Sequence, residues 1–93
     1  MEYEWDPAKA QANLRKHGVT FEFATHAFRD SNRIERPDES DHYGEEWWQV
    51  IGRADKFVLM VVFTFRSDIT RIISARRATR NEFIEYWNGQ IPV

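Results

Sequence analysis

The alternation of apolar and polar side chains predicts three strands in the second half of the chain. Residues Phe57–Phe65 are mostly apolar at successive positions, which is typical of a central strand buried on both faces. The stretches Trp47–Arg53 and Ile69–Arg77 alternate in polarity, as strands with one buried face do. Short polar connections at 54–56 and 66–68 separate the three stretches, so we expect an antiparallel meander.

The first half of the chain carries helix signals instead. Asp6 can cap a helix that begins at Pro7, and Gly18 supplies a C-terminal stop, so we expect a helix over 7–17. Thr20 is suited to be the N-cap of a short second helix. The apolar stripe predicted for the first helix consists of Ala8, Ala12 and Leu14. The second helix has four apolar residues at helical spacing, Phe21, Ala24, Ala27 and Phe28.

A capping box marks the start of the last helix. Thr79 and Glu82 have the spacing at which each side chain bonds to the backbone N–H of the other. We expect this helix to end at Gly89. The side chains expected to point inward are Phe83, Ile84 and Trp87.

The remaining segments complete the predicted architecture. Residues 1–5 alternate in polarity and predict a short strand, whereas 33–46 have no clear period and predict mostly loop, with room for an edge strand at 33–36. The tail, 90–93, is expected to fray unless it packs on a partner. The prediction is one α+β domain over 1–93, with a short N-terminal strand, two helices, an antiparallel three-stranded meander and a C-terminal helix.

Composition agrees with a small domain that has its own core. The 93 residues suffice for one domain, and 42% of them are hydrophobic. The chain has no Cys, which excludes disulfides and thiolate zinc sites. Its N-terminus, MEYEWDPAKA, is polar where a signal peptide would be apolar, and the apolar run 57–65 falls short of the ~20 residues of a membrane-spanning helix. We expect a cytoplasmic protein without membrane contacts.

Charge is distributed unevenly along the chain. The net charge of −2 argues against a protein that coats nucleic acid nonspecifically. Residues 35–46 are acidic, whereas 71–80 hold four Arg and no acid. Strand alternation places Arg76 and Arg77 on opposite faces, so one can anchor structure while the other faces a ligand. Arg80 opposes the dipole of the last helix unless an anion binds there. Two interpretations stay open: an anion-binding site, or ion pairs with the acidic segment.

The other polar residues give no metal signature. His17, His26 and His42 could each exchange a proton near neutral pH, and each also suits a capping or surface role. Their spacing matches no known metal motif, and the acidic residues of 38–46 do not have the spacing of a calcium loop. We therefore expect no metal and no cofactor.

The adjacent residues Trp47 and Trp48 are expected to point to opposite faces of their strand, one of them outward. An outward Trp beside Arg53 could stack on a nucleobase. Core packing combined with a partner interface is the alternative.

Two separated motifs resemble those of the BrnT family of toxins. The first, WDPAKAQANLRKHGVTFEFATHAF, pairs a Trp-Asp-Pro helix start with a Lys-His-Gly-Val-Thr-Phe turn. The second comprises Val50–Arg53, the apolar strand and the run RIISARRA from Arg71. The resemblance covers 4–86, and the order of the motifs agrees with the predicted elements. The chain departs from the family at Trp47-Trp48, where many members carry a basic residue, for which a stacking Trp could substitute in part.

The resemblance implies a toxin of a bacterial type II toxin–antitoxin module. Such a toxin has a RelE-like fold and is an endoribonuclease that cleaves RNA without a metal and arrests translation. Its implied partner is a BrnA-like antitoxin with a ribbon-helix-helix domain, and operator DNA is contacted chiefly through that antitoxin. A homodimer is a further option.

The same resemblance implies a set of site residues. In the implied reaction the ribose 2′-OH attacks the adjacent phosphate and a 5′-hydroxyl leaves, which requires phosphate positioning, charge stabilisation and two proton movements. The expected catalytic residues are His17, Arg53, Arg76 and Arg77. The expected RNA contacts are Lys9, Lys16, Arg80 and Trp47. His17 is the candidate general acid or base, with a helix-capping role as its alternative.

Two competing function classes remain. The chain could be a catalytically inactive homologue that only binds the antitoxin. A metal-dependent nuclease that uses the acidic segment ranks last.

Overall fold

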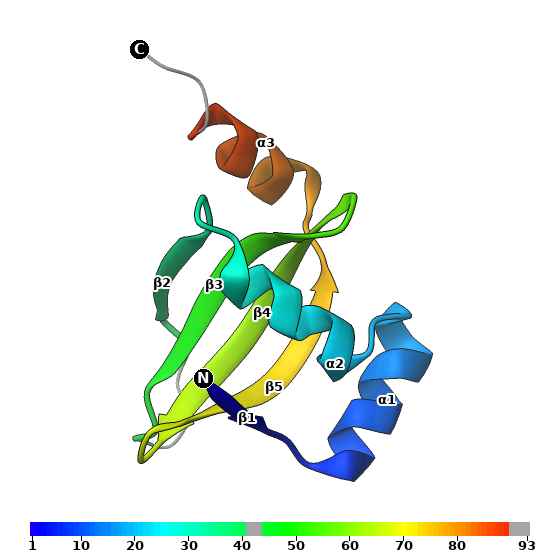
Figure 1. The fold of residues 1–93 in the computed structure, drawn as a ribbon, viewed down its shortest axis with the longest axis vertical. Helices are drawn as coiled ribbons and strands as arrows, with labels where there is room; N and C mark the ends of the chain where they lie inside the picture. The colour runs from blue at the N-terminus through cyan, green and yellow to red at the C-terminus, as the bar shows by residue number, and fades with distance from the viewer. Residues whose placement is uncertain (41–43, 90–93) are drawn as a thin grey trace.

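The computed structural model describes residues 1–40 and 44–89 and has a five-stranded sheet at its centre, in the order β1-β5-β4-β3-β2 (Figure 1). The strands are β1 (Glu2–Glu4), β2 (Ile34–Asp38), β3 (Trp47–Ala54), β4 (Phe57–Arg66) and β5 (Ile69–Arg77). The helices are α1 (Pro7–His17), α2 (Phe21–Ala24), the 3₁₀ helix η1 (Thr25–Arg29) and α3 (Arg80–Asn88). The α+β class is confirmed, and the predicted tail lies outside the described residues.

The sheet is mixed and larger than the predicted meander. Strands β3, β4 and β5 form the expected antiparallel meander. Strand β1 extends it by parallel pairing with β5, and β2 extends it by antiparallel pairing with β3. The edge strand allowed for at 33–36 is present as β2, and it continues to Asp38, into the part of 33–46 expected to be loop. Its residues alternate between partly buried and exposed positions.

A β-bulge changes which face of the sheet the side chains of β5 lie on. Val62 pairs with Ser74 and Phe63 pairs with Ile72, which leaves Ile73 as an extra residue. Strict alternation predicted Ile72 and Ala75 on opposite faces, and this was wrong. Both side chains are buried in the same cluster, because the bulge shifts the alternation by one position.

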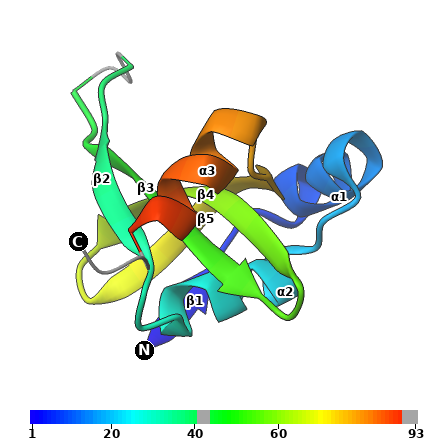
Figure 2. The same cartoon turned by 90° about the horizontal axis from the view of Figure 1, so that it is seen from above.

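Helices cover both faces of the sheet. Figure 2 shows α2 and α3 on opposite sides. One cluster lies between the sheet and the α2–η1 segment and includes Phe21, Phe28, Val50, Val61 and Phe63. The cluster on the α3 face includes Ile51, Val58, Met60, Val62 and Tyr86. The continuously apolar β4 supplies side chains to both clusters, as expected for a central strand.

The buried face of α1 is polar at its centre. Asn13 is 7% exposed, whereas the Leu14 of the predicted stripe is 46% exposed. The Asn13 side-chain amide donates to the Ala75 carbonyl at 2.8 Å and accepts from the Ala75 N–H at 3.0 Å. It also donates to the Val19 carbonyl at 2.9 Å. The predicted stripe was therefore wrong, because backbone groups of β5 beyond the end of β1 are what this helix face must satisfy.

The start and end of α3 follow the prediction, but its orientation does not. The capping box between Thr79 and Glu82 is present. The buried side chain of α3 is Tyr86, at 2% exposure, and not the predicted apolar set. Phe83, Ile84 and Trp87 are 48%, 43% and 37% exposed.

Candidate functional site

Basic side chains gather at the end of the sheet where Asp55 and Lys56 connect β3 to β4. Arg53 of β3 pairs with Val58 of β4, and the Ala78 N–H, just after β5, donates to the Val58 carbonyl at 2.9 Å. Arg53, Val58 and the C-terminal end of β5 are therefore side by side in the sheet. Because neighbouring strands are about 4.8 Å apart, Arg53 lies roughly 10 Å from the end of β5. We call this region the basic end. Its cationic residues are Arg53, Lys56, Arg76, Arg77 and Arg80.

The two adjacent arginines of β5 have different environments, as alternation predicts. Arg76 faces α3 and donates to both carboxylate oxygens of Glu82, at 2.8 and 3.0 Å. Glu82 also accepts from the Thr79 N–H at 2.8 Å, so Arg76 is tied to the first turn of α3. Burial raises the pKa of Glu82, but the hydrogen bonds from Arg76 and Thr79 outweigh it and hold that pKa below its usual value. Arg76 therefore anchors α3.

Arg77 is exposed on the opposite face and stacks on an aromatic ring. Its guanidinium carbon lies 4.4 Å from the centroid of the Phe57 ring, and the Lys56 ammonium lies 5.6 Å from the same centroid. Within the described part of the chain, Arg77 makes no ion pair. Stacking orients the guanidinium and leaves its N–H donors available to a ligand.

His17 is the last residue of α1, the helix whose Asn13 contacts the edge of β5. It follows Asn13 by one turn of α1, and Arg77 follows Ala75 by two positions of β5. Each residue therefore lies about 6 Å along its own element from the contact between Asn13 and Ala75. In Figure 1, α1 and β5 both run upward, so their C-terminal ends lie toward the same end of the molecule. Lys16 is the exposed neighbour of His17.

A polar hollow of about 430 Å³ adjoins the basic end between η1 and the turn after β3. The Arg53 Nε donates to the Asp55 carbonyl at 3.1 Å. The backbone N–H of Arg53 donates to Asp30 at 2.8 Å. We call this feature the η1 hollow, and its lining residues are His26, Arg29, Asp30, Arg53 and Asp55.

Asp30 connects the two faces of the sheet. Its carboxylate accepts from the N–H of Arg53, from the N–H of Asn32 at 2.9 Å and from the Tyr86 hydroxyl. Burial raises the pKa of Asp30, but these hydrogen bonds outweigh it and the net pKa is lowered. Burial and the Asp30 carboxylate together raise the pKa of Tyr86 to about 12. The pair therefore consists of a carboxylate and a neutral phenol near neutral pH.

The alternative in which the acidic segment neutralises the β5 arginines is wrong for the residues described. Arg71 bonds to Glu4 of β1, and Arg76 bonds to Glu82 of α3. Among the described residues, the arginines that reach the acidic segment are Arg33, at 3.0 Å from Glu35, and Arg66, at 3.6 Å from Glu45, and neither belongs to β5.

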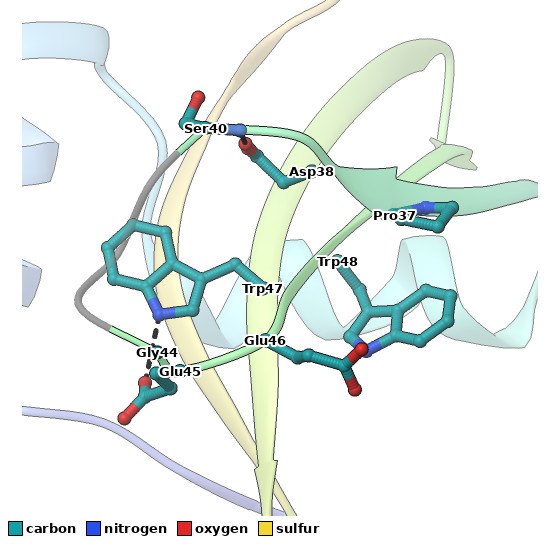
Figure 3. Close-up of a pocket in the computed structure, with 8 residues that line it drawn as sticks. All are labelled: Pro37, Asp38, Ser40, Gly44, Glu45, Glu46, Trp47 and Trp48. Atoms are coloured by element: carbon teal, nitrogen blue, oxygen red, sulfur yellow. Dashed lines mark hydrogen bonds between the residues drawn. The ribbon is translucent and has the colours of Figure 1, made fainter.

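Lys9 and Trp47 lie away from the basic end. Lys9 precedes His17 by eight residues, or about 12 Å along α1. Trp47 begins β3 and Arg53 nearly ends it, about 20 Å away, so the expectation of an outward Trp beside Arg53 was wrong. Figure 3 shows the Trp47 and Trp48 rings diverging, and the Trp47 Nε1 donates to Glu45 at 2.9 Å. The surrounding pocket, of about 250 Å³, is acidic.

No group of three or more His, Asp or Glu side chains suited to a metal occurs among residues 1–40 and 44–89. His42 lies outside the described residues, and so does Asp41 of the acidic segment. His26 is exposed, and its ring packs edge-on against Phe23.

Sequence reasoning missed three features that shape this region. Arg29 lies three residues after His26 on the exposed side of η1, a helical spacing that could have signalled a shared surface. Neither Asp30 nor Asn13 has a local sequence signal that reveals its role. Their roles depend on contacts with Tyr86 and Ala75, which are distant in sequence.

Fold and site together define a small α+β protein with an exposed basic surface at one end of its sheet. A family model described as "Ribonuclease toxin, BrnT, of type II toxin-antitoxin system" matches residues 5–82, and the chain belongs to this family. No curated protein matches the chain. Among the helices described, none is long and apolar enough to cross a membrane.

Proposed function

We propose that the chain is an endoribonuclease toxin that cleaves RNA at the basic end without a metal, on a RelE-like fold. The observation that carries this proposal is the Arg77 guanidinium, exposed, stacked on Phe57 and free of any ion pair within the described residues. His17 lies at the C-terminal end of α1, one turn beyond the contact of Asn13 with β5. Family membership supports ribonuclease chemistry, and the arrangement supplies a cation and a proton carrier for it.

The proposed reaction is an internal transesterification. The ribose 2′-oxygen forms a bond to the adjacent phosphorus, the bond from phosphorus to the 5′-oxygen breaks, and a 2′,3′-cyclic phosphate and a 5′-hydroxyl result. One proton leaves the 2′-hydroxyl and one reaches the 5′-oxygen. Arg77 stabilises the extra negative charge on the phosphoryl oxygens. His17 carries one of the two protons.

The other expected residues have supporting roles in this proposal. Arg76 positions the first turn of α3 through Glu82, and so places Arg80 at the basic end. Lys16 and Arg80 contact flanking phosphates, and the exposed Arg53 adds positive charge beside the turn after β3. The RNA contacts expected for Lys9 and Trp47 remain predictions that this site does not use.

Cleavage by purified protein tests the proposal. We expect wild type to cleave RNA with chelator present and to leave cyclic phosphate and 5′-hydroxyl ends. Arg77→Gln and His17→Gln should each lose cleavage by at least about a hundredfold, while Arg66→Gln, the same charge change at the opposite end, retains it. Full activity in both site variants would contradict the site, and activity abolished by chelator would contradict the metal-free route.

We propose a ribbon-helix-helix antitoxin as the partner, with any operator DNA contacted through it. This partner acts in the cytoplasm, where translation occurs. The exposed apolar side chains of α3, Phe83, Ile84 and Trp87, favour a second candidate function, an inactive homologue that only binds the antitoxin. Tight antitoxin binding by a wild-type protein that cleaves no RNA would support the second candidate.

A further inference from the structure

We propose that the η1 hollow binds a backbone phosphate of the RNA substrate that flanks the phosphate being cleaved. This inference rests on the proposed function. It adds His26 and Arg29 to the RNA-binding surface and gives the RNA a path around the turn at Asp55 and Lys56.

A continuous series of side-chain contacts joins the hollow to Arg77. Arg77 stacks on Phe57, the ring centroids of Phe57 and Phe23 are 6.2 Å apart, and those of Phe23 and His26 are 5.8 Å apart. His26 lines the hollow. Positive groups therefore occur at both ends of a short aromatic ridge, an arrangement that suits a single strand whose bases stack while its phosphates contact cations.

The cationic groups of the hollow are available to a ligand. Arg29 and Arg53 are exposed, and neither makes an ion pair within the described residues. The Arg53 Nε is held by the Asp55 carbonyl at 3.1 Å, which orients the guanidinium and leaves its terminal nitrogens free. Arg side chains presented in this way match the oxygens of a phosphodiester. The ring nitrogens of His26 make no hydrogen bond to any residue of 1–40 or 44–89.

The two acids of the hollow differ in their effect. Asp30 is already bonded to Arg53, Asn32 and Tyr86, so its carboxylate oxygens are engaged and its charge is partly offset. The Asp55 carboxylate accepts no hydrogen bond in the described structure, and it opposes a phosphate in the same hollow. Removal of each charge therefore changes affinity in a predictable direction: loss of Arg29 weakens RNA binding, and loss of the Asp55 charge strengthens it.

The chain offers matched controls at the other end of the sheet. Arg66 is an exposed arginine and Asp68 an exposed turn acid, both beside the connection from β4 to β5. Arg66→Gln and Asp68→Asn make the same changes in net charge as Arg29→Gln and Asp55→Asn. Asp55 has a φ of 53°, a region that Asn tolerates, so Asp55→Asn keeps the turn.

The experiment measures binding of a fluorescein-labelled single-stranded RNA of about 12 nucleotides with 2′-O-methyl riboses, which cannot undergo the proposed cleavage. Fluorescence anisotropy gives Kd over a series of salt concentrations. We expect Arg29→Gln to weaken binding by about fivefold and to reduce the slope of log Kd against log salt by about one. We expect Asp55→Asn to tighten binding severalfold, with both controls within about twofold of wild type.

Each other outcome overturns the inference. Equal effects at both ends would mean that net charge alone is responsible. Unchanged RNA binding together with lost antitoxin binding would make the hollow a protein interface. The proposed function fails separately: it fails if wild type does not cleave unmodified RNA, whereas the hollow fails if wild type cleaves and the Arg29 and Asp55 variants bind as it does.

Discussion

The Tyr86 hydroxyl donates a hydrogen bond to the Asp30 carboxylate, and this contact joins α3 on one face of the sheet to the end of η1 on the other. Asp30 reaches Tyr86 beside the backbone of Arg53, at the end of the sheet that carries the basic groups. Arg76 of β5 and Arg36 of β2 also bond to α3, through Glu82 and Glu85, whereas the large apolar side chains Phe83, Ile84 and Trp87 are exposed. The Tyr86–Asp30 pair therefore helps to fix where α3 lies relative to the proposed RNA site.

Replacement of the hydroxyl should destabilise the protein with little change in packing. Tyr86→Phe removes a hydrogen bond to a charged acceptor, so we expect a loss of about 1.5–3 kcal/mol in the free energy of unfolding. Urea denaturation measures it. Tyr3→Phe is the control, because Tyr3 packs on Phe28 and its hydroxyl makes no hydrogen bond within the described residues. Equal losses in the two variants would contradict a specific role for the pair.

The same pair predicts a pH dependence. The folded-state pKa of Asp30 is lowered, so its contribution to stability is present above the unfolded pKa of about 3.9 and is lost as pH falls through the folded pKa. Glu82, whose pKa is also lowered, acts in the same direction. We expect the midpoint of urea unfolding to fall as pH drops below about 4. The fall should be smaller in Asp30→Asn, and an identical pH profile in that variant would exclude Asp30 as a source.

Loss of the Asn13 side-chain N–H donor should destabilise the protein. Asn13→Asp keeps the shape but turns the donating nitrogen into an acceptor that faces the Ala75 and Val19 carbonyls. We expect a loss of about 3 kcal/mol in the free energy of unfolding near neutral pH, because one buried carboxylate oxygen then faces two carbonyl oxygens with no donor. Gln11→Glu, an exposed position of the same helix, makes the same charge change and should shift stability by less than about 0.5 kcal/mol. Comparable losses would contradict the role of Asn13.

Arg76 and Arg77 should separate stability from activity. Arg76→Gln breaks the paired hydrogen bonds to Glu82, so we expect a loss of about 1–2 kcal/mol in the free energy of unfolding. Arg77→Gln should leave stability within about 0.5 kcal/mol of wild type and abolish RNA cleavage. Denaturation and cleavage are measured on the same samples. A stable, fully active Arg77 variant would show that the exposed arginine has no part in the reaction.

Gly52 should accept no side chain. A Cβ at this position would lie 2.4 Å from the Ala27 carbonyl oxygen, so Gly52→Ala forces η1 away from β3. We expect a loss of about 1–3 kcal/mol in the free energy of unfolding. At Gly89 an added Cβ would lie 3.4 Å from its nearest atom, the Tyr86 carbonyl oxygen, so Gly89→Ala should leave the free energy of unfolding nearly unchanged. If both glycines tolerate alanine equally, η1 is not packed directly on β3.

Local signals explain why much of the fold was predictable. Helix caps involve residues only a few positions apart in sequence. The helix ends predicted from Asp6, Gly18 and the Thr79–Glu82 capping box are all present. The apolar run of β4 also needs no distant partner to be recognised as a central strand. The separation of Arg76 from Arg77 followed from strand alternation alone.

The errors share a different cause, namely contacts between residues far apart in sequence. Hydrophobicity placed Leu14 inward, but the backbone of β5 required an amide and so Asn13 is buried. Phe83 is more apolar than Tyr86, yet only Tyr86 can reach Asp30, so the helix turns that residue inward. The η1 hollow could not be predicted from the sequence for the same reason, since His26, Arg29 and Arg53 come together only when η1 packs on β3.

Asn13 also has a consequence for association. Strand β1 ends at Glu4, opposite Arg71, so β5 would otherwise present an open edge near Ala75. An open edge of this kind pairs readily with a strand from another chain. The Asn13 amide occupies both the N–H and the carbonyl of Ala75, as a neighbouring strand would. A single side chain thus protects the proposed site, two residues further along β5, from aggregation through that edge.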